Sequence, residues 1–333
     1  MKYRMTRRGK VALLIFAVGI IVFVCIFMRK NHASVPVQNI SSNITTEAPT
    51  TIVTTTTPNI TTDSVTEKAT IPPSRISGCT SAMVYCLEND DILFSQDIGR
   101  MVAPASLTKL LTACTVLEFM DPENICTVGS ELYLVQPDSS LCWINQGQQL
   151  TVEQLITGMM MASGNDAAYT LAVNTTRSCF PDLCLTDYQA AEKFSGLMND
   201  LAAELGMNSS NFVNPDGWDN TEQYTTAYDL CLLARYAMTL PVIREAASCC
   251  EKQIVLRSGE VFTWHNSNKL LDPYSEFYSE NASGLKTGST VNAGNCLISI
   301  FEIDGLTYLS IVTGCETDHD RYDLTLRLIS EYT

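Results

Sequence analysis

The chain has 333 residues, long enough for one large or two modest domains once non-globular segments are set aside. Its formal net charge is −15. Residues 1–30 hold 7 of the 21 Lys and Arg residues and no acidic residue, so residues 31–333 carry 14 basic and 36 acidic groups, a net charge of −22. Such a surface argues against nucleic acid and anionic lipid as partners, and suits either a cationic substrate or simple solubility.

The first 28 residues predict a membrane anchor. Residues 1–10 form a basic tail, and residues 11–28 are 18 residues without a charge, long enough to cross a bilayer as a helix. The positive-inside rule keeps the tail in the cytoplasm and exports the rest of the chain. A cleaved signal peptide is the alternative, but Arg29 and Lys30 follow the apolar segment where a small-residue cleavage site would be expected.

Residues 29–77 are predicted to form a disordered linker, because they are rich in Thr, Ser and Pro and poor in aromatic residues. Such a composition cannot bury a core. The segment is therefore expected to be an extended tether that connects the anchor to one globular domain of residues 78–333.

The first half of this domain is expected to form a β-hairpin and then helices. Strands are predicted at residues 81–87 and 91–95, around a turn at Asn89-Asp90, and a helix is predicted to begin near Ala105. Further helices are indicated by N-terminal caps, at Thr151 with an end near Ala162, at Thr186 with an end near Leu205 and Gly206, and at Thr226 with an end before Pro241.

The second half of the domain returns to strands. They are predicted at residues 252–256, 261–264, 284–287, 296–303 and 307–312, and Asp304-Gly305 is a hairpin turn between the last two. A final amphipathic helix covers residues 319–330. Strands at both ends with helices between them indicate an α+β fold, an antiparallel sheet packed with helices.

Of the 13 cysteines, Cys25 lies in the apolar segment and 12 would be exported. An even number outside the cytoplasm permits disulfides, with Cys179 and Cys184 closely spaced; free thiols that pack as small apolar side chains are the alternative. No cysteine pair has zinc-like spacing and the three histidines are far apart, so neither a metal nor a cofactor is expected.

Ser106 and Lys109 form a Ser-x-x-Lys motif on the first predicted helix. Residues three apart share a helix face, so the Oγ of Ser106 and the Nζ of Lys109 can meet. A serine hydroxyl needs a base to take its proton, and an ammonium cannot do so. Lys109 must therefore be held neutral by desolvation or by a nearby cation such as Lys286. A solvated surface lysine is the alternative, which the apolar residues around the motif disfavour.

Ser163-Gly-Asn165 follows an apolar helix and is expected on a loop. Ser163 would relay a proton to a leaving amine, and Asn165 would hydrogen-bond Lys109 and a substrate amide. Taken alone, these two residues are equally typical of a helix cap.

Lys286-Thr287-Gly288 is expected at the end of a strand. Lys286 and Thr287 would bind a free carboxylate, and Gly288 would let a substrate backbone approach closely. The N–H of Ser289 would pair with the N–H of Ser106 as an oxyanion hole. Together the three motifs predict acyl transfer through a covalent serine ester.

With these motifs the chain resembles the penicillin-recognising serine enzymes, and among them the D-alanyl-D-alanine carboxypeptidases of the low-molecular-mass penicillin-binding proteins. The resemblance runs from about Cys79 to the C-terminus and includes the segments ELGMNSSNFVNPDGW, YTTAYDLCLLARYAM and HNSNKLL. It implies the β-lactamase/penicillin-binding-protein-like transpeptidase fold, in which the active site lies between an antiparallel sheet and a helical subdomain. It also implies a substrate, the peptidoglycan stem peptide that ends in D-Ala-D-Ala, and β-lactam antibiotics as covalent inhibitors.

The resulting prediction is a single-pass protein of a bacterial cell membrane whose extracytoplasmic domain is a serine D,D-carboxypeptidase. Ser106 would attack the penultimate D-Ala carbonyl, with Lys109 as base, and trimming the stem peptide would remodel the wall. Three features depart from the family pattern: an apparent insertion at Cys179 and Cys184, an anchor at the N-terminus rather than the C-terminus, and the lack of an additional β domain.

Other functions stay open to different degrees. A D,D-endopeptidase that cuts cross-links is not separable from the carboxypeptidase by sequence. A β-lactamase is disfavoured, since no Glu-x-x-Leu-Asn segment lies between Asn165 and Lys286. A poorly catalytic sensor of β-lactams or muropeptides is disfavoured by the intact motifs. A Ser-His-Asp hydrolase would need His265, which lies in a segment that the resemblance already explains, or His319, which opens the last helix.

Overall fold

The computed structural model describes residues 76–333. The predicted basic tail, the apolar helix of residues 11–28 and all but the end of the linker lie outside the described residues. Within residues 76–333, none of the helices combines the length and the apolar character needed to span a bilayer.

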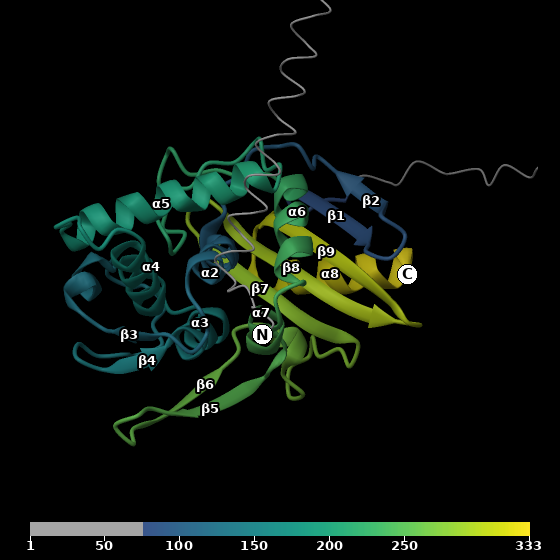
Figure 1. The fold of residues 1–333 in the computed structure, drawn as a ribbon. Helices are drawn as coiled ribbons and strands as arrows, with labels where there is room; N and C mark the ends of the chain where they lie inside the picture. The colour runs from purple at the N-terminus through teal and green to yellow at the C-terminus, as the bar shows by residue number, and fades with distance from the viewer. Residues whose placement is uncertain (1–75) are drawn as a thin grey trace, which may run out of the picture. The chain divides into compact units, whose positions relative to one another are not determined.

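The central element is a five-stranded antiparallel sheet with the strand order β2-β1-β9-β8-β7 (Figure 1). Its strands are β1 (Ser81–Cys86), β2 (Asp91–Gln96), β7 (Ala282–Thr290), β8 (Gly294–Ile303) and β9 (Leu306–Cys315). β1 pairs with β9 in a register that places Ser81 opposite Thr313, so the two ends of the domain meet in the middle of the sheet. Asp304 and Gly305 adopt positive φ angles of 53° and 79°, which confirms the hairpin turn predicted between β8 and β9.

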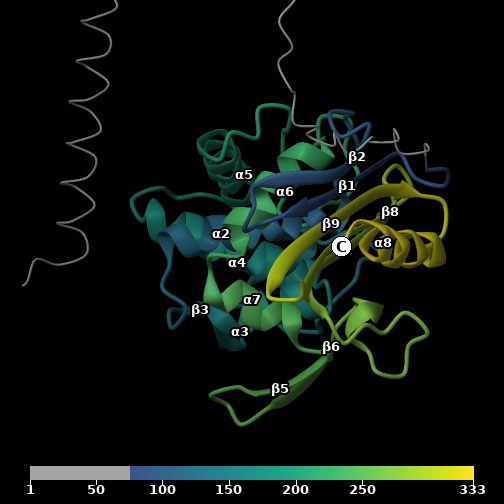
Figure 2. The same ribbon diagram turned by 90° about the vertical axis from the view of Figure 1, so that its right-hand side faces the viewer.

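Helices cover both faces of this sheet (Figures 1 and 2). They are α2 (Thr108–Phe119), α3 (Val152–Met161), α4 (Asn165–Cys179), α5 (Asp187–Glu204), α6 (Ala227–Ala237), α7 (Pro241–Ser248) and α8 (Asp318–Tyr332). Alternate residues of β1 show the two faces. Met83 and Tyr85 pack into the large core with α2, α6 and α7, whereas Ala82 and Val84 pack into a second core with Tyr322 of α8. The predicted α+β class is confirmed.

Short elements complete the domain. Two two-stranded sheets, β3 (Ile125–Thr127) with β4 (Gln149–Thr151) and β5 (Glu251–Val255) with β6 (Val261–His265), are separate from the main sheet. The 3₁₀ turns are η1 (Ala105–Leu107), η2 (Ser130–Leu134) and η3 (Lys269–Leu271). The predicted capping boxes at Thr151 and Thr186 are both formed, and Thr226 caps α6. Sequence analysis did not predict α4 or α7.

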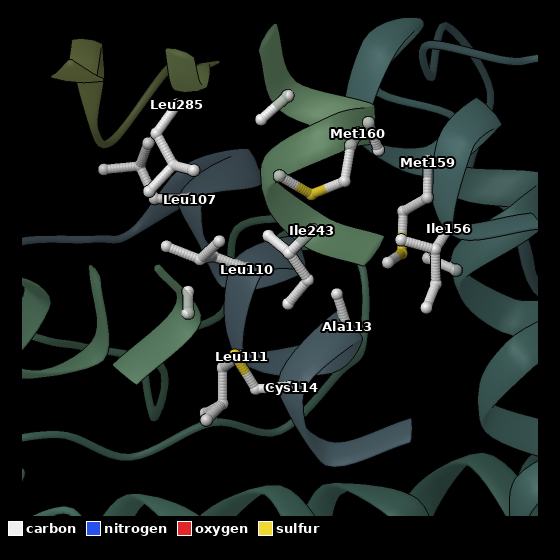
Figure 3. Close-up of a cluster of buried hydrophobic side chains, with 14 of the residues drawn as sticks. Leu107, Leu110, Leu111, Ala113, Cys114, Ile156, Met159, Met160, Ile243 and Leu285 are labelled. Atoms are coloured by element: carbon white, nitrogen blue, oxygen red, sulfur yellow. The ribbon is translucent and has the colours of Figure 1, made fainter. Parts of the chain in front are cut away.

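Helix α2 contributes much of the large core, and Figure 3 shows its side chains Leu110 and Leu111 in one cluster with Ile243. Every residue from Thr108 to Val116 is buried. Leu110 and Leu111 belong to one core cluster with Met160 of α3 and Ile243 of α7. Because this part of the helix is buried on all sides, the polar side chains on it are removed from water. Lys109 is such a side chain.

The twelve cysteines within residues 76–333 are all free thiols, including Cys179 and Cys184. Seven of them are buried. Free cysteine packs as a small apolar residue, so the structure favours the thiol alternative over a disulfide framework.

Candidate active site

Ser106 lies in η1, directly before α2, and Lys109 lies in the first turn of α2. The Nζ of Lys109 donates a hydrogen bond of 2.7 Å to the Oγ of Ser106 and one of 2.6 Å to the backbone carbonyl of Asp216. Ala105, the residue before the serine, has a φ of +49°, a left-handed conformation that a non-glycine residue adopts only at a cost. The surrounding fold therefore imposes the position of the nucleophile.

Burial sets the protonation of Lys109. Its side chain is completely inaccessible to solvent, and this desolvation lowers its pKa from 10.5 to about 8, against the opposing pull of the Asp216 and Asp166 carboxylates. Of the two causes that the sequence offered, desolvation is the larger. Repulsion between the two buried lysines adds to burial in lowering the pKa of Lys286.

The second motif lies at the junction of α3 and α4. Ser163 is buried with a φ of +56°, and its Oγ accepts a hydrogen bond of 3.0 Å from the Nζ of Lys286. Asn165 is the first residue of α4 rather than part of a longer loop. Its Nδ2 donates to the Asp216 carboxylate at 2.6 Å. The predicted hydrogen bond from Asn165 to Lys109 is thus wrong in the described structure, where Asp216 connects the two residues.

The third motif lies inside β7, which continues to Thr290, and not at the end of the strand as predicted. Lys286 is 1% exposed and also donates to the backbone carbonyl of Thr287 at 3.1 Å. The hydroxyl of Thr287 is 2.7 Å from that of Ser267. A side chain at Gly288 would come within 3.1 to 3.2 Å of the Ala105 Cβ and of the amide nitrogens of Ser106 and Leu107. Gly288 therefore lets β7 pack against the nucleophile, a role that the sequence analysis did not predict.

The motif residues meet at a small cleft of about 80 Å³. Ser106, Asn165 and Ser289 line it together with Trp218 and residues 138–140. Ser289 belongs to the same strand as Lys286 and Thr287. The structure thus brings all three predicted motifs to one place, and the use of the Ser289 N–H in an oxyanion hole remains a prediction.

Asp216 and Gly217 are functional residues that sequence analysis did not identify. Asp216 is 1% exposed and bonds both Lys109 and Asn165, and burial raises the pKa of its carboxyl group. Gly217 has a φ of +88°, and a Cβ there would lie 1.8 Å from the backbone oxygen of Ala105. The run Asn-Pro-Asp-Gly was a turn signal within a family-like segment, but nothing local connected it to Lys109.

Arg321 and Asp166 fix the two walls of the cleft. Arg321, on α8, donates from one guanidinium nitrogen to the Gly288 carbonyl and the Ser289 hydroxyl, both at 3.0 Å. The Asp166 carboxylate accepts hydrogen bonds from the backbone amides of Cys142 at 3.0 Å and Ile144 at 3.2 Å, and so anchors the segment that carries residues 138–140. Both are buried charged groups whose partners are distant in sequence, so no short motif identifies them.

Site and fold together define a serine acyl-transfer centre at a sheet–helix junction, and comparison with known proteins agrees. The chain matches the family model of D-alanyl-D-alanine carboxypeptidases, the S11 peptidases, over residues 66–317, and it belongs to this family.

Several characterised relatives are similar to the chain. D-alanyl-D-alanine carboxypeptidase DacF of Bacillus subtilis is 26% identical over 72% of this chain and 58% of its own length, and DacC of Escherichia coli is 31% identical over 72% and 57%. The chain thus spans less than two thirds of these two relatives. The DD-transpeptidase of Streptomyces K15 is similar in structure, with a TM-score of 0.69 and 26% identity over 78% of this chain and 98% of that one. Penicillin-binding protein D2 of Listeria monocytogenes, solved in its ampicillin-bound form, gives a TM-score of 0.62 at 28% identity with the same coverage.

Proposed function

We propose that this protein is a membrane-tethered, extracytoplasmic serine D,D-carboxypeptidase that removes the terminal D-Ala from peptidoglycan stem pentapeptides and is acylated by penicillins. One observation carries the proposal most directly: the Ser106 hydroxyl is hydrogen-bonded to a fully buried lysine within the fold of this family. The tether and the location at the bacterial membrane rest on the sequence of residues 1–77.

The contacts of the site support a two-step reaction. Neutral Lys109 takes the proton of Ser106 while the Oγ bonds to the carbonyl carbon of the penultimate D-Ala. The bond from that carbon to the nitrogen of the terminal D-Ala then breaks, and the nitrogen takes up the proton that Lys109 holds, relayed by the Ser163 hydroxyl, which receives a hydrogen bond from Lys286. Lys109 is then neutral again for the second step. Water completes the cycle by hydrolysing the ester, with Lys109 again as base.

The β7 side of the site suits the substrate carboxylate. Lys286 and Arg321 are both buried and both contact the strand segment of residues 286–289. A terminal carboxylate at Thr287 would meet positive charge in a region largely removed from water, where charge pairing is strong.

The test is D-alanine release by the purified full-length protein from a peptide that ends in D-Ala-D-Ala, combined with intact mass after exposure to benzylpenicillin. We expect release and a single long-lived penicilloyl adduct, and we expect the Ser106→Ala variant to lose both. Rapid destruction of the penicillin without an adduct would indicate a β-lactamase. A stable adduct without D-alanine release or cleavage of any peptide would indicate a sensor. Separation of cross-linked stem peptides without D-alanine release would indicate an endopeptidase.

A further inference from the structure

Cys79 and Cys315 lie at the ends of two neighbouring strands of the main sheet. Cys79 comes two residues before β1, and Cys315 is the last residue of β9. Beyond the last register pair of β1 and β9, the amide of Thr80 donates to the Thr313 carbonyl at 2.8 Å. A Cβ at Gly314 would lie 2.1 Å from the side-chain oxygen of Thr80, so the two chains stay in contact there. The next residues outward on the two chains are Cys79 and Cys315.

The two thiols lie on the same face of the sheet. Cys315 is 1% exposed and belongs to the second core, between the sheet and α8, and the half-buried Cys79 packs against that core. The thiols are close enough for Cys79 to add to burial in raising the pKa of Cys315. Opposite residues of antiparallel strands have Cα atoms about 4.5–5.5 Å apart, within the range of about 4.4–6.8 Å that a disulfide spans. The pair therefore has the placement that a disulfide requires.

The sheet separates Cys315 from its other neighbouring thiol, Cys296. After burial and Cys79, Cys296 makes a smaller contribution to the raised pKa of Cys315. Its side chain, however, belongs to the large core on the opposite face of the sheet. Its Sγ accepts a hydrogen bond of 3.5 Å from the Gly314 amide and donates one of 3.5 Å to the Ala293 carbonyl. Cys79 is thus the partner that shares a face with Cys315.

We propose that Cys79 and Cys315 are a modification site, at which an oxidant of the disulfide class, either a low-molecular-weight disulfide or a thiol–disulfide oxidoreductase, joins them covalently. The inference goes beyond the proposed function and takes from it only the location outside the cytoplasm, where disulfides form and persist.

The reaction is an exchange in two steps. Cys79 is the more exposed thiol, so its thiolate attacks the oxidant, forms a mixed disulfide and releases one thiol. The Cys315 thiolate then attacks the Cys79 sulfur and releases the second thiol. The two cysteines lose two protons and two electrons, and the disulfide of the oxidant is reduced to two thiols.

The bond would fasten the start of the domain to the end of the sheet. It closes a loop that contains nearly the whole domain, from β1 to β9, and so restricts the unfolded chain. The chain enters the domain beside Cys79, where Ile76 is held to β2 only by hydrogen bonds with the Gln96 side chain, at 2.7 and 3.0 Å, and by packing against the second core. A pull on the preceding segment would then be carried to β9 by a covalent bond.

The experiment begins with the full-length protein, reduced with dithiothreitol, freed of it and incubated with oxidised glutathione at pH 8. Peptide mapping without reduction should show Cys79 linked to Cys315. The Tm of the oxidised form should be about 5–15 °C above that of the reduced form. In Cys79→Ser and in Cys315→Ala this difference should disappear. Cys184→Ser is the matched control, because it removes an exposed thiol from another part of the domain, and it should keep the difference.

Each comparison is made between two redox forms of one variant, so an effect of the substitution itself on folding cancels. A glutathione adduct that persists on Cys79, or a map without this cross-link, would overturn the inference. A Tm difference that survives in Cys79→Ser would also overturn it and assign the effect to other cysteines. None of these readouts requires D-alanine release, so failure of the proposed function and failure of this inference are separate results.

Discussion

The pKa of Lys109 gives a direct test of its role as the base. A pKa of about 8 leaves roughly one molecule in ten with a neutral lysine at pH 7, whereas an ordinary value of 10.5 would leave about one in three thousand. The rate of Ser106 acylation should therefore rise about tenfold per pH unit below pH 8 and level off above it. Substitution Lys109→Arg keeps a cation that does not deprotonate, and it should slow acylation by roughly 10²–10⁴-fold without restoring a plateau.

The assay is intact mass against time after addition of benzylpenicillin, between pH 6 and pH 9.5. Lys193→Arg is a matched control, because Lys193 lies on α5 with its ammonium over the ring of Phe180, and neither residue lines the cleft. It should reproduce the wild-type profile. A wild-type rate that does not change between pH 6 and pH 9, or a Lys109→Arg variant that acylates normally, would refute the assignment of Lys109 as the base.

Three further predictions concern stability and the walls of the site. Lys109→Met should raise the free energy of unfolding by on the order of 3 kcal/mol below pH 8, because burial of the charged lysine destabilises the folded state. This gain should shrink as the pH rises to 10.5, where the lysine of the unfolded chain also becomes neutral. Urea titrations at several pH values measure it, and a gain that does not change with pH would contradict a cost of burying this charge. Gly217→Ala should lower the free energy of unfolding by roughly 3 kcal/mol or more, because its Cβ would collide with the Ala105 carbonyl, and it should abolish penicillin acylation at 37 °C. Gly259→Ala, at a φ of +90° with open space around it, should lower it by only about 1 kcal/mol, as thermal unfolding of both variants would show. Asp166→Ala should lower kcat/KM and destabilise the protein by about 2–3 kcal/mol, because two buried amides lose a charged acceptor. A variant with the stability and activity of the wild-type protein would contradict the role of Asp166 as an anchor.

The sequence predicted the elements whose signals are local. Thr151 and Thr186 start helices because each forms a capping box within four residues, and Asp304-Gly305 forms a hairpin because both residues tolerate positive φ. Helix α4 was missed because Asn165 begins it with no side-chain cap. Helix α7 was missed because Pro241 was interpreted as the end of α6, although it also occupies the first position of a new helix.

The residues of the site fall into the same two groups, those with a local sequence signal and those without one. Ser106, Lys109, Ser163, Asn165 and Lys286 were predicted because each motif is short and its chemistry follows from spacing. Asp216, Asp166 and Arg321 were not, because their effects depend on burial and on partners that folding brings from elsewhere in the chain. Arg321 is 33 residues from Gly288, and Asp216 is 107 residues from Lys109. The hydrogen bonds of Asn165 and the position of Lys286 within β7 also depend on contacts between segments that are far apart in the sequence.

The pairing of β1 with β9 determines at which stage of folding the site around Ser106 can form. The hydroxyls of Ser81 and Thr313, which meet in this pair, are 232 residues apart, so the sheet closes only after nearly the whole domain is available. Strand β7 contacts Ser106 as part of that sheet. Arg321, in the last helix, donates a hydrogen bond to the Gly288 carbonyl of β7. A partly synthesised chain would therefore carry Ser106 without the assembled site around it.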